Sequence, residues 1–107
     1  MEDRRRHHRI PVTLPVILRH AGRIIPATAV NLSCGGMYIR ADQRDIAIDK
    51  PVEVIFDLTE GERDLSMRGN ITRVDESGEE TGLGVQFTNL FSQSHKALTE
   101  YLNKHLN

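Results

Sequence analysis

The feature of the sequence that most constrains its fold is an alternation of side chains in the stretch that begins at Pro51. Apolar side chains occupy every second position of this stretch: Val52, Val54, Phe56 and Leu58. Such alternation is typical of a β-strand with one buried face. Similar short runs, separated by turn signals such as Ala21-Gly22, recur between residues 11 and 87. About six strands at this short spacing favour an antiparallel barrel, because closure removes exposed strand edges.

The last part of the chain has a different period. Leu98, Leu102 and Leu106 recur every four residues, which predicts an amphipathic helix over about residues 92–106. Ser92 or Ser94 offers a suitable N-cap. The predicted fold class is therefore all-β with one helix, a six-stranded antiparallel β-barrel with a C-terminal α-helix. We expect residues 11–107 to form this domain and residues 1–10, which lack hydrophobic periodicity, to form a flexible arm.

The composition limits the class of protein. A chain of 107 residues, 38% hydrophobic and 27% charged, is long enough for one domain with its own core. Its single cysteine, Cys34, excludes an internal disulfide and fits a reducing compartment. No apolar run approaches the ~20 residues of a membrane helix, and the start lacks the apolar stretch of a secretory signal. We therefore expect a cytoplasmic protein without membrane insertion.

Charge is unevenly distributed along the chain, although the formal net charge is only −1. Residues 1–23 carry six arginines and two acidic residues, whereas residues 24–107 carry eight basic and thirteen acidic residues. A protein that binds nucleic acid generally spreads basic residues over one face. A positive arm on a negative body instead favours a local anion site, and we expect no nucleic-acid partner.

The positive charge is concentrated in Arg4-Arg5-Arg6-His7-His8-Arg9. A guanidinium is permanently charged, and its planar fork of donors fits a phosphate. Arg5 and Arg9 would lie ~13 Å apart in an extended arm or ~6 Å apart in a coiled one. Either spacing lets two guanidinium groups embrace a doubly charged ligand. A solvated basic tail is the alternative interpretation of these arginines taken alone.

A second polar motif, Asn31-x-Ser33-x-x-Gly36, falls at the end of a predicted strand. Asn31 and Ser33 should leave one face of the strand, because side chains alternate and Leu32 points to the core. Amide and hydroxyl groups both donate and accept hydrogen bonds. Gly35 and Gly36 allow a positive φ and a close approach of the backbone to an anion. Taken alone, the motif is also consistent with a polar turn.

Together the two motifs resemble those of the PilZ domain family, bacterial receptors for the second messenger cyclic di-GMP (c-di-GMP). That family shows R-x-x-x-R on an N-terminal loop and [D/N]-x-S-x-x-G on an early barrel strand. The matching residues here are Arg5 and Arg9, then Asn31, Ser33 and Gly36. The similarity continues through residues 32–39 and through Gly82-Leu83-Gly84-Val85-Gln86-Phe87 before the helix, so it covers nearly the whole chain.

The resemblance implies a c-di-GMP receptor that is not an enzyme, with the ligand held between the arm and the barrel. The implied ligand contacts are Arg4, Arg5, Arg9, Asn31, Ser33, Gly35, Gly36 and Arg73. Arginine pairs with phosphate or with the edge of guanine. Asn31 should recognise the base less strongly than an aspartate would, by ~1 kcal/mol. Arg73, expected late in the sixth strand, could stack its guanidinium on a base.

For signalling we hypothesise a disorder-to-order mechanism. Ligand phosphates would neutralise the arm, which would fold over the barrel and present a new surface to an unidentified effector protein in trans. No cofactor besides the ligand is implied. Some family members have lost ligand binding and act as adaptors through protein contacts, and this stays the alternative function.

Several residues suggest chemistry that their surroundings do not support. Cys34 with His7 or His8 lacks the third group that orients a catalytic pair, and no histidine has metal-ligand spacing with a cysteine pair. We therefore predict neither an enzyme nor a metal site. Tyr38 is interpreted as packing at the barrel rim, and residues 75–80 as a solvated acidic turn.

Overall fold

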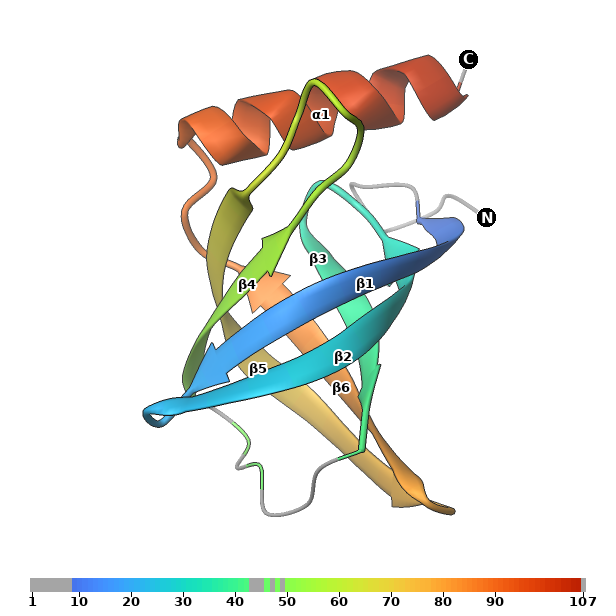
Figure 1. Ribbon diagram of the computed structural model, residues 1–107, viewed down its shortest axis with the longest axis vertical. Helices are drawn as coiled ribbons and strands as arrows, with labels where there is room; N and C mark the ends of the chain where they lie inside the picture. Colours follow the sequence, from blue (N-terminus) through green and yellow to red (C-terminus); the bar gives the residue numbers. More distant parts are fainter. Residues whose placement is uncertain (1–8, 43–45, 47, 49, 107) are drawn as a thin grey trace, which may run out of the picture.

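The protein is a closed antiparallel barrel with one helix (Figure 1). The computed structural model describes residues 9–42, 46, 48 and 50–106. Its elements are β1 (Ile10–His20), β2 (Arg23–Leu32), β3 (Gly36–Ala41), β4 (Pro51–Phe56), β5 (Leu65–Ser77), β6 (Glu80–Phe87) and α1 (Gln93–Leu106). The strands follow one another around the barrel in the order β1-β2-β3-β6-β5-β4. The predicted fold class is confirmed.

The core lies inside the barrel and is built from the alternating apolar residues. Val52, Val54 and Phe56 on β4 are all buried, whereas their neighbours on the strand are partly exposed. Helix α1 lies across one end of the barrel (Figure 1). Its Leu98 and Leu102 are fully buried in the same core. The helix therefore closes one end of the barrel and shares its hydrophobic stabilisation.

Helix α1 begins where the sequence indicates. The Ser92 hydroxyl accepts a hydrogen bond from the backbone N–H of His95, at 3.1 Å, which is the geometry of an N-cap. Of the two predicted caps, Ser92 fills this role. Ser94 does something different, since its hydroxyl accepts a hydrogen bond from the backbone N–H of Ser66 on β5, at 3.0 Å. The two serines thus start the helix and attach it to the barrel.

The two prolines of β1 lie in the part of the strand that is paired with β2 but not with β4. Strand β1 pairs with β4 only over Val16–Arg19, whereas its pairing with β2 runs from Ile10 to His20. Pro11 and Pro15 therefore lie in the half of β1 that has β2 as its sheet neighbour. This explains how a strand with two prolines belongs to a closed barrel. Strand β1 also begins at Ile10, one residue inside the predicted arm.

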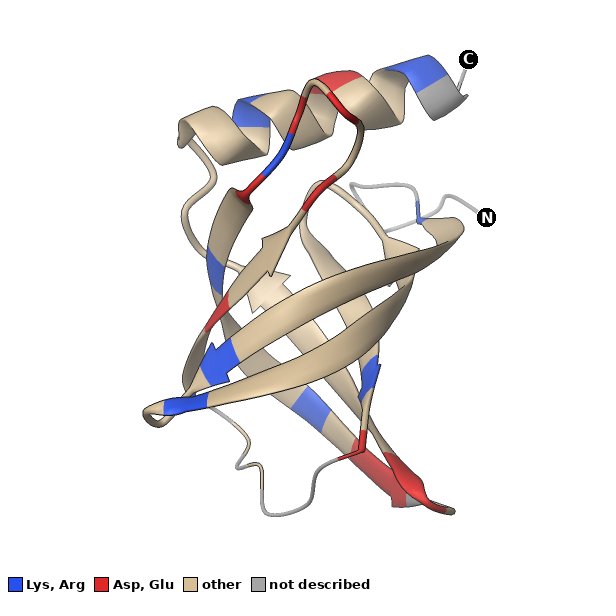
Figure 2. Ribbon diagram, in the orientation of Figure 1, with Lys and Arg blue, Asp and Glu red and all other residues tan. Residues whose placement is uncertain are grey.

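The predicted acidic turn over residues 75–80 is wrong in extent. Strand β5 continues to Ser77, strand β6 begins at Glu80, and these two residues pair with each other. The turn is a two-residue hairpin loop in which Gly78 has a φ of 76°. Acidic residues fit here because the outer face of a barrel strand is solvated. Acidic residues gather at this hairpin and at the loop after β4, at opposite ends of the molecule (Figure 2).

Candidate functional site

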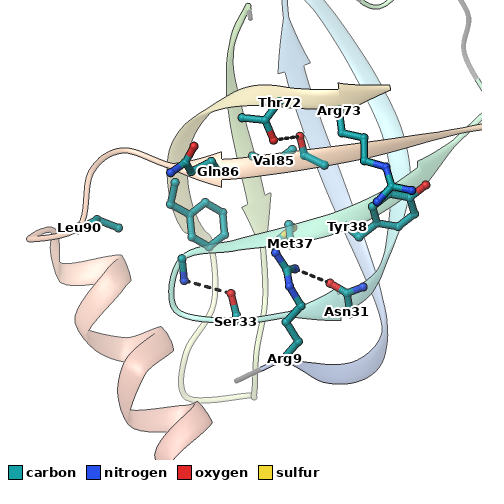
Figure 3. A pocket seen from close by; sticks show the side chains of 13 residues that line it. Arg9, Asn31, Ser33, Met37, Tyr38, Thr72, Arg73, Val85, Gln86 and Leu90 are labelled. Carbon is teal, nitrogen blue, oxygen red and sulfur yellow. Dashed lines mark hydrogen bonds between the residues drawn. The ribbon is translucent and has the colours of Figure 1, made fainter. Parts of the chain in front are cut away.

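A pocket of about 540 Å³ brings together segments that are distant in the sequence. It is lined by Arg9, Asn31, Ser33, Gly35, Met37, Tyr38, Thr72, Arg73, Gly84, Val85, Gln86, Phe87 and Leu90 (Figure 3). This lining contains two arginines and no carboxylate, which suits an anionic ligand. Five of the predicted contacts line it, whereas Gly36 lies just behind the lining. Arg4 and Arg5 fall outside the described residues.

The two sequence motifs meet at this pocket. Arg9 donates a hydrogen bond from Nη1 to the Oδ1 atom of Asn31, at 2.9 Å (Figure 3). The register of β2 against β3 shifts between Ala29 and Asn31. Such a bulge re-aims the side chains that follow it. It leaves Asn31 partly exposed at the strand end, where its amide can face both Arg9 and the pocket.

Ser33 shapes the turn that forms one wall of the pocket. Its side chain is 2% exposed. The hydroxyl oxygen accepts hydrogen bonds from the backbone N–H groups of Gly35 and Gly36, each at 3.1 Å. The hydroxyl also donates to the carbonyl oxygen of Gly36, at 3.2 Å. Because a hydroxyl has one proton and two lone pairs, these contacts use its whole capacity, and none is left to contact a base directly.

Gly36 is required for packing behind the pocket. A Cβ atom placed on it would overlap the carbonyl oxygen of Val85 on β6. The two residues that precede Gly36 also fix the turn to its surroundings. The carbonyl oxygen of Gly35 accepts a hydrogen bond from the backbone N–H of Phe87, at 2.8 Å. The carbonyl oxygen of Cys34 lies 2.9 Å from Nε2 of His95 on α1, so the turn is tied to both β6 and the helix.

Arg73 lies on the opposite wall of the pocket. It belongs to β5 and not to the sixth strand, so its predicted position was wrong by one strand. Its Nε atom donates to Oδ2 of Asp75, at 2.8 Å. Its guanidinium carbon lies 5.7 Å from the centre of the Tyr38 ring, within the range of a cation–π contact.

The same carboxylate holds a tyrosine. The Tyr38 hydroxyl donates to Oδ2 of Asp75, at 2.6 Å. This hydrogen bond to Asp75, together with burial, raises the pKa of Tyr38 above its usual value. The hydrogen bonds from Tyr38 and Arg73 lower the pKa of Asp75. The sequence pattern predicted a packing role for Tyr38 and a solvated turn for Asp75, so neither residue was predicted to contribute to the site.

Other kinds of site find no support in the part of the chain that the structure describes. There, no group of three or more histidine, cysteine, aspartate or glutamate side chains could hold a metal ion. Within the same residues, no helix is long and apolar enough to span a bilayer.

The sequence profile of a known domain decides the family. The PilZ domain profile matches residues 3–104. The chain belongs to the PilZ domain family. No curated protein sequence matches the chain significantly.

Several solved structures share this fold at low sequence identity. The inhibitor of motility MotI/DgrA of Bacillus subtilis is 22% identical, with a TM-score of 0.80 over 99% of this chain and 53% of that one. The PilZ domain of YcgR from Escherichia coli, solved with c-di-GMP, is 14% identical, with a TM-score of 0.78 over 95% and 91%. The PilZ domain of CeSA from a cellulose-synthesizing bacterium is 22% identical, with a TM-score of 0.67 over 94% and 99%. The chain thus spans about half of the Bacillus protein.

Proposed function

We propose that this PilZ domain is a receptor for c-di-GMP. The observation that carries the proposal is the hydrogen bond between Arg9 and Asn31, because it joins the two family motifs at the rim of one pocket. Family membership supports the same ligand, as do two structures of similar fold solved with c-di-GMP, the PilZ domain of YcgR of E. coli and MrkH of Klebsiella pneumoniae.

The pocket walls suit the two chemical halves of this ligand. Arg5 and Arg9, with Arg4 as an accessory, would bind the phosphates, because guanidinium groups pair with phosphate oxygens through two parallel hydrogen bonds. Asn31 would bind the edge of a guanine with its amide. Gly35 would let a base approach the backbone of the turn. Arg73, on the opposite wall, would stack on a base.

Signalling would follow from ordering of the arm. Once the phosphates are bound, the arm, which ends at Arg9 before β1, would lie over the barrel and form a composite surface with it, and an effector protein would recognise that surface in trans. Hydrogen exchange of the full chain tests this step. We expect the amides of the arm to gain protection at saturating c-di-GMP. Unchanged exchange in the bound state would contradict the ordering and leave the binding proposal intact.

Calorimetric titration with c-di-GMP tests the binding itself. Arg5→Ala and Arg9→Ala should each weaken binding by about 10- to 100-fold, the range of one lost charge-assisted hydrogen bond. Arg63→Ala is the matched control, because Arg63 is an exposed arginine that pairs with Asp57 on the loop after β4 and does not line the pocket. We expect it to bind like the wild type.

Two results would refute the proposal. One is the absence of binding by the wild type, and the other is unchanged binding by both arm variants. A wild type that ignores the nucleotide but forms a defined complex with a protein would favour the adaptor function instead.

A further inference from the structure

Two glycines on β6 open a passage across the outside of the barrel. Gly84 lies between Tyr38 on β3 and Arg73 on β5, and it pairs with both. Gly82 lies two residues earlier on the same face, and it pairs with Asp75 on β5. A Cβ atom on Gly82 would overlap the hydroxyl of Tyr38. The Tyr38 side chain therefore crosses β6 where that strand has no side chains of its own.

The crossing closes a triangle of contacts. The Tyr38 hydroxyl and the Arg73 Nε atom donate to the same oxygen of Asp75, at 2.6 and 2.8 Å. The guanidinium in turn lies 5.7 Å from the Tyr38 ring (Figure 3). Each side chain is held by the other two. Among the described residues, Asp75 and Tyr38 are the partners of this guanidinium, so its terminal Nη groups remain available to a ligand.

The triangle lies at the wall of the pocket. Tyr38 and Arg73 both line it, whereas Asp75 does not. A free arginine side chain loses much rotamer freedom when it is fixed against a ligand. An arginine that is already fixed loses less, and this preorganisation strengthens binding. Asp75 can therefore hold Arg73 from outside the pocket lining. A carboxylate within the lining would instead repel an anionic ligand.

We propose that Tyr38 and Asp75 are positioning residues that hold the Arg73 guanidinium for contact with a guanine base of the bound dinucleotide. The gap at Gly82 and Gly84 provides the space for this arrangement. The inference rests on the proposed c-di-GMP function. It adds Tyr38 and Asp75 as residues that act by positioning Arg73 and do not themselves recognise the base.

A double-mutant cycle measured by calorimetric titration with c-di-GMP tests the inference. Tyr38→Phe, which keeps the ring, and Asp75→Asn, which keeps the shape, should each weaken binding by about 3- to 10-fold, the range expected when one more side chain has to be immobilised on binding. Arg73→Ala should weaken it at least as much. Adding either change to Arg73→Ala should have no further effect, because the residue being positioned is gone.

The matched control is Glu76→Gln, which removes the neighbouring exposed carboxylate that the triangle does not use. It should bind like the wild type or slightly more tightly. Tighter binding by Asp75→Asn would overturn the inference, since the carboxylate would then act only by repelling the ligand. Equal losses with and without Arg73 would also overturn it, because the two residues would then support the pocket in general. If the wild type did not bind at all, the proposed function would fail, and this inference with it.

Discussion

Replacing Gly36 with alanine tests whether close contact between β3 and β6 fixes the wall of the pocket. The added methyl would overlap the carbonyl oxygen of Val85 and lie 3.2 Å from its carbonyl carbon. Both are backbone atoms, so no side-chain rotation can relieve the overlap. Relief requires the two strands to separate locally. Separation would strain the hydrogen bond from the Phe87 N–H to the Gly35 carbonyl, which is 2.8 Å long.

The expected loss of stability combines these effects. Overpacking in a well-packed region costs about 1–3 kcal/mol, and each strained hydrogen bond costs about 0.5–1.5 kcal/mol. Alanine restricts the unfolded chain more than glycine does, which offsets about 0.4–1 kcal/mol. These terms sum to about 0.5–4 kcal/mol. We therefore expect Gly36→Ala to lower the free energy of unfolding by about 2 kcal/mol, the middle of that range and a large fraction of the roughly 5–15 kcal/mol typical of a domain.

Urea denaturation followed by circular dichroism measures this loss. Gly61→Ala is the matched control, because the nearest atom to a Cβ there is Thr59 Oγ1 at 4.0 Å and no positive φ is involved. The control should equal the wild type or exceed it by up to about 1 kcal/mol. If Gly36→Ala fell within about 0.5 kcal/mol of the control, a scatter typical of neutral surface changes, the argument from strand spacing would be refuted.

Three further outcomes follow from the same contacts. Ser33→Ala should lower the free energy of unfolding by about 1–3 kcal/mol without ligand, because buried N–H groups lose their acceptor. Unchanged stability in urea would show that the Ser33 hydroxyl does not stabilise the turn. Leu98→Ala should cost about 2–5 kcal/mol, and a loss below about 1 kcal/mol would show that α1 does not share the core. The raised pKa of Tyr38 means that its hydroxyl stabilises the fold below pH 10 and that this contribution disappears as pH rises through the folded-state pKa. The stability difference between wild type and Tyr38→Phe should therefore shrink above about pH 10, and a constant difference would contradict the contact with Asp75.

The barrel could be predicted because its signal is local. Alternation on β4 and the Ala21-Gly22 turn each depend on a few neighbouring residues. The extent of β5 could not be predicted in the same way. Asp75 and Glu76 look like loop residues because they are charged, yet they belong to the part of β5, from Gly69 to Ser77, that is paired with β6. Pairing with a partner strand overrode the local composition there.

The sequence motifs of the candidate site could be recognised in advance, but the contacts that its side chains make could not. Ser33 belongs to a motif associated with ligand binding, but its hydroxyl makes all of its hydrogen bonds within the turn. The triangle of Tyr38, Arg73 and Asp75 spans β3 and β5 with β6 between them, so no sequence window contains it. The signal that could have found it is the pair of glycines at 82 and 84. Two glycines on one face of a strand indicate that something crosses there.

The two walls of the pocket hold their arginines in different ways, and this suggests different tasks. Arg73 is held by a carboxylate and an aromatic ring, whereas Arg9 is held by the neutral amide of Asn31. An arginine that must turn toward a phosphate has to leave its partner first, and a neutral partner is easier to leave than a charged one. An aspartate at position 31 would recognise guanine better by ~1 kcal/mol and would also hold Arg9 more tightly, by up to about 1 kcal/mol for an exposed pair. The two effects nearly cancel, so asparagine at this position is compatible with a working receptor.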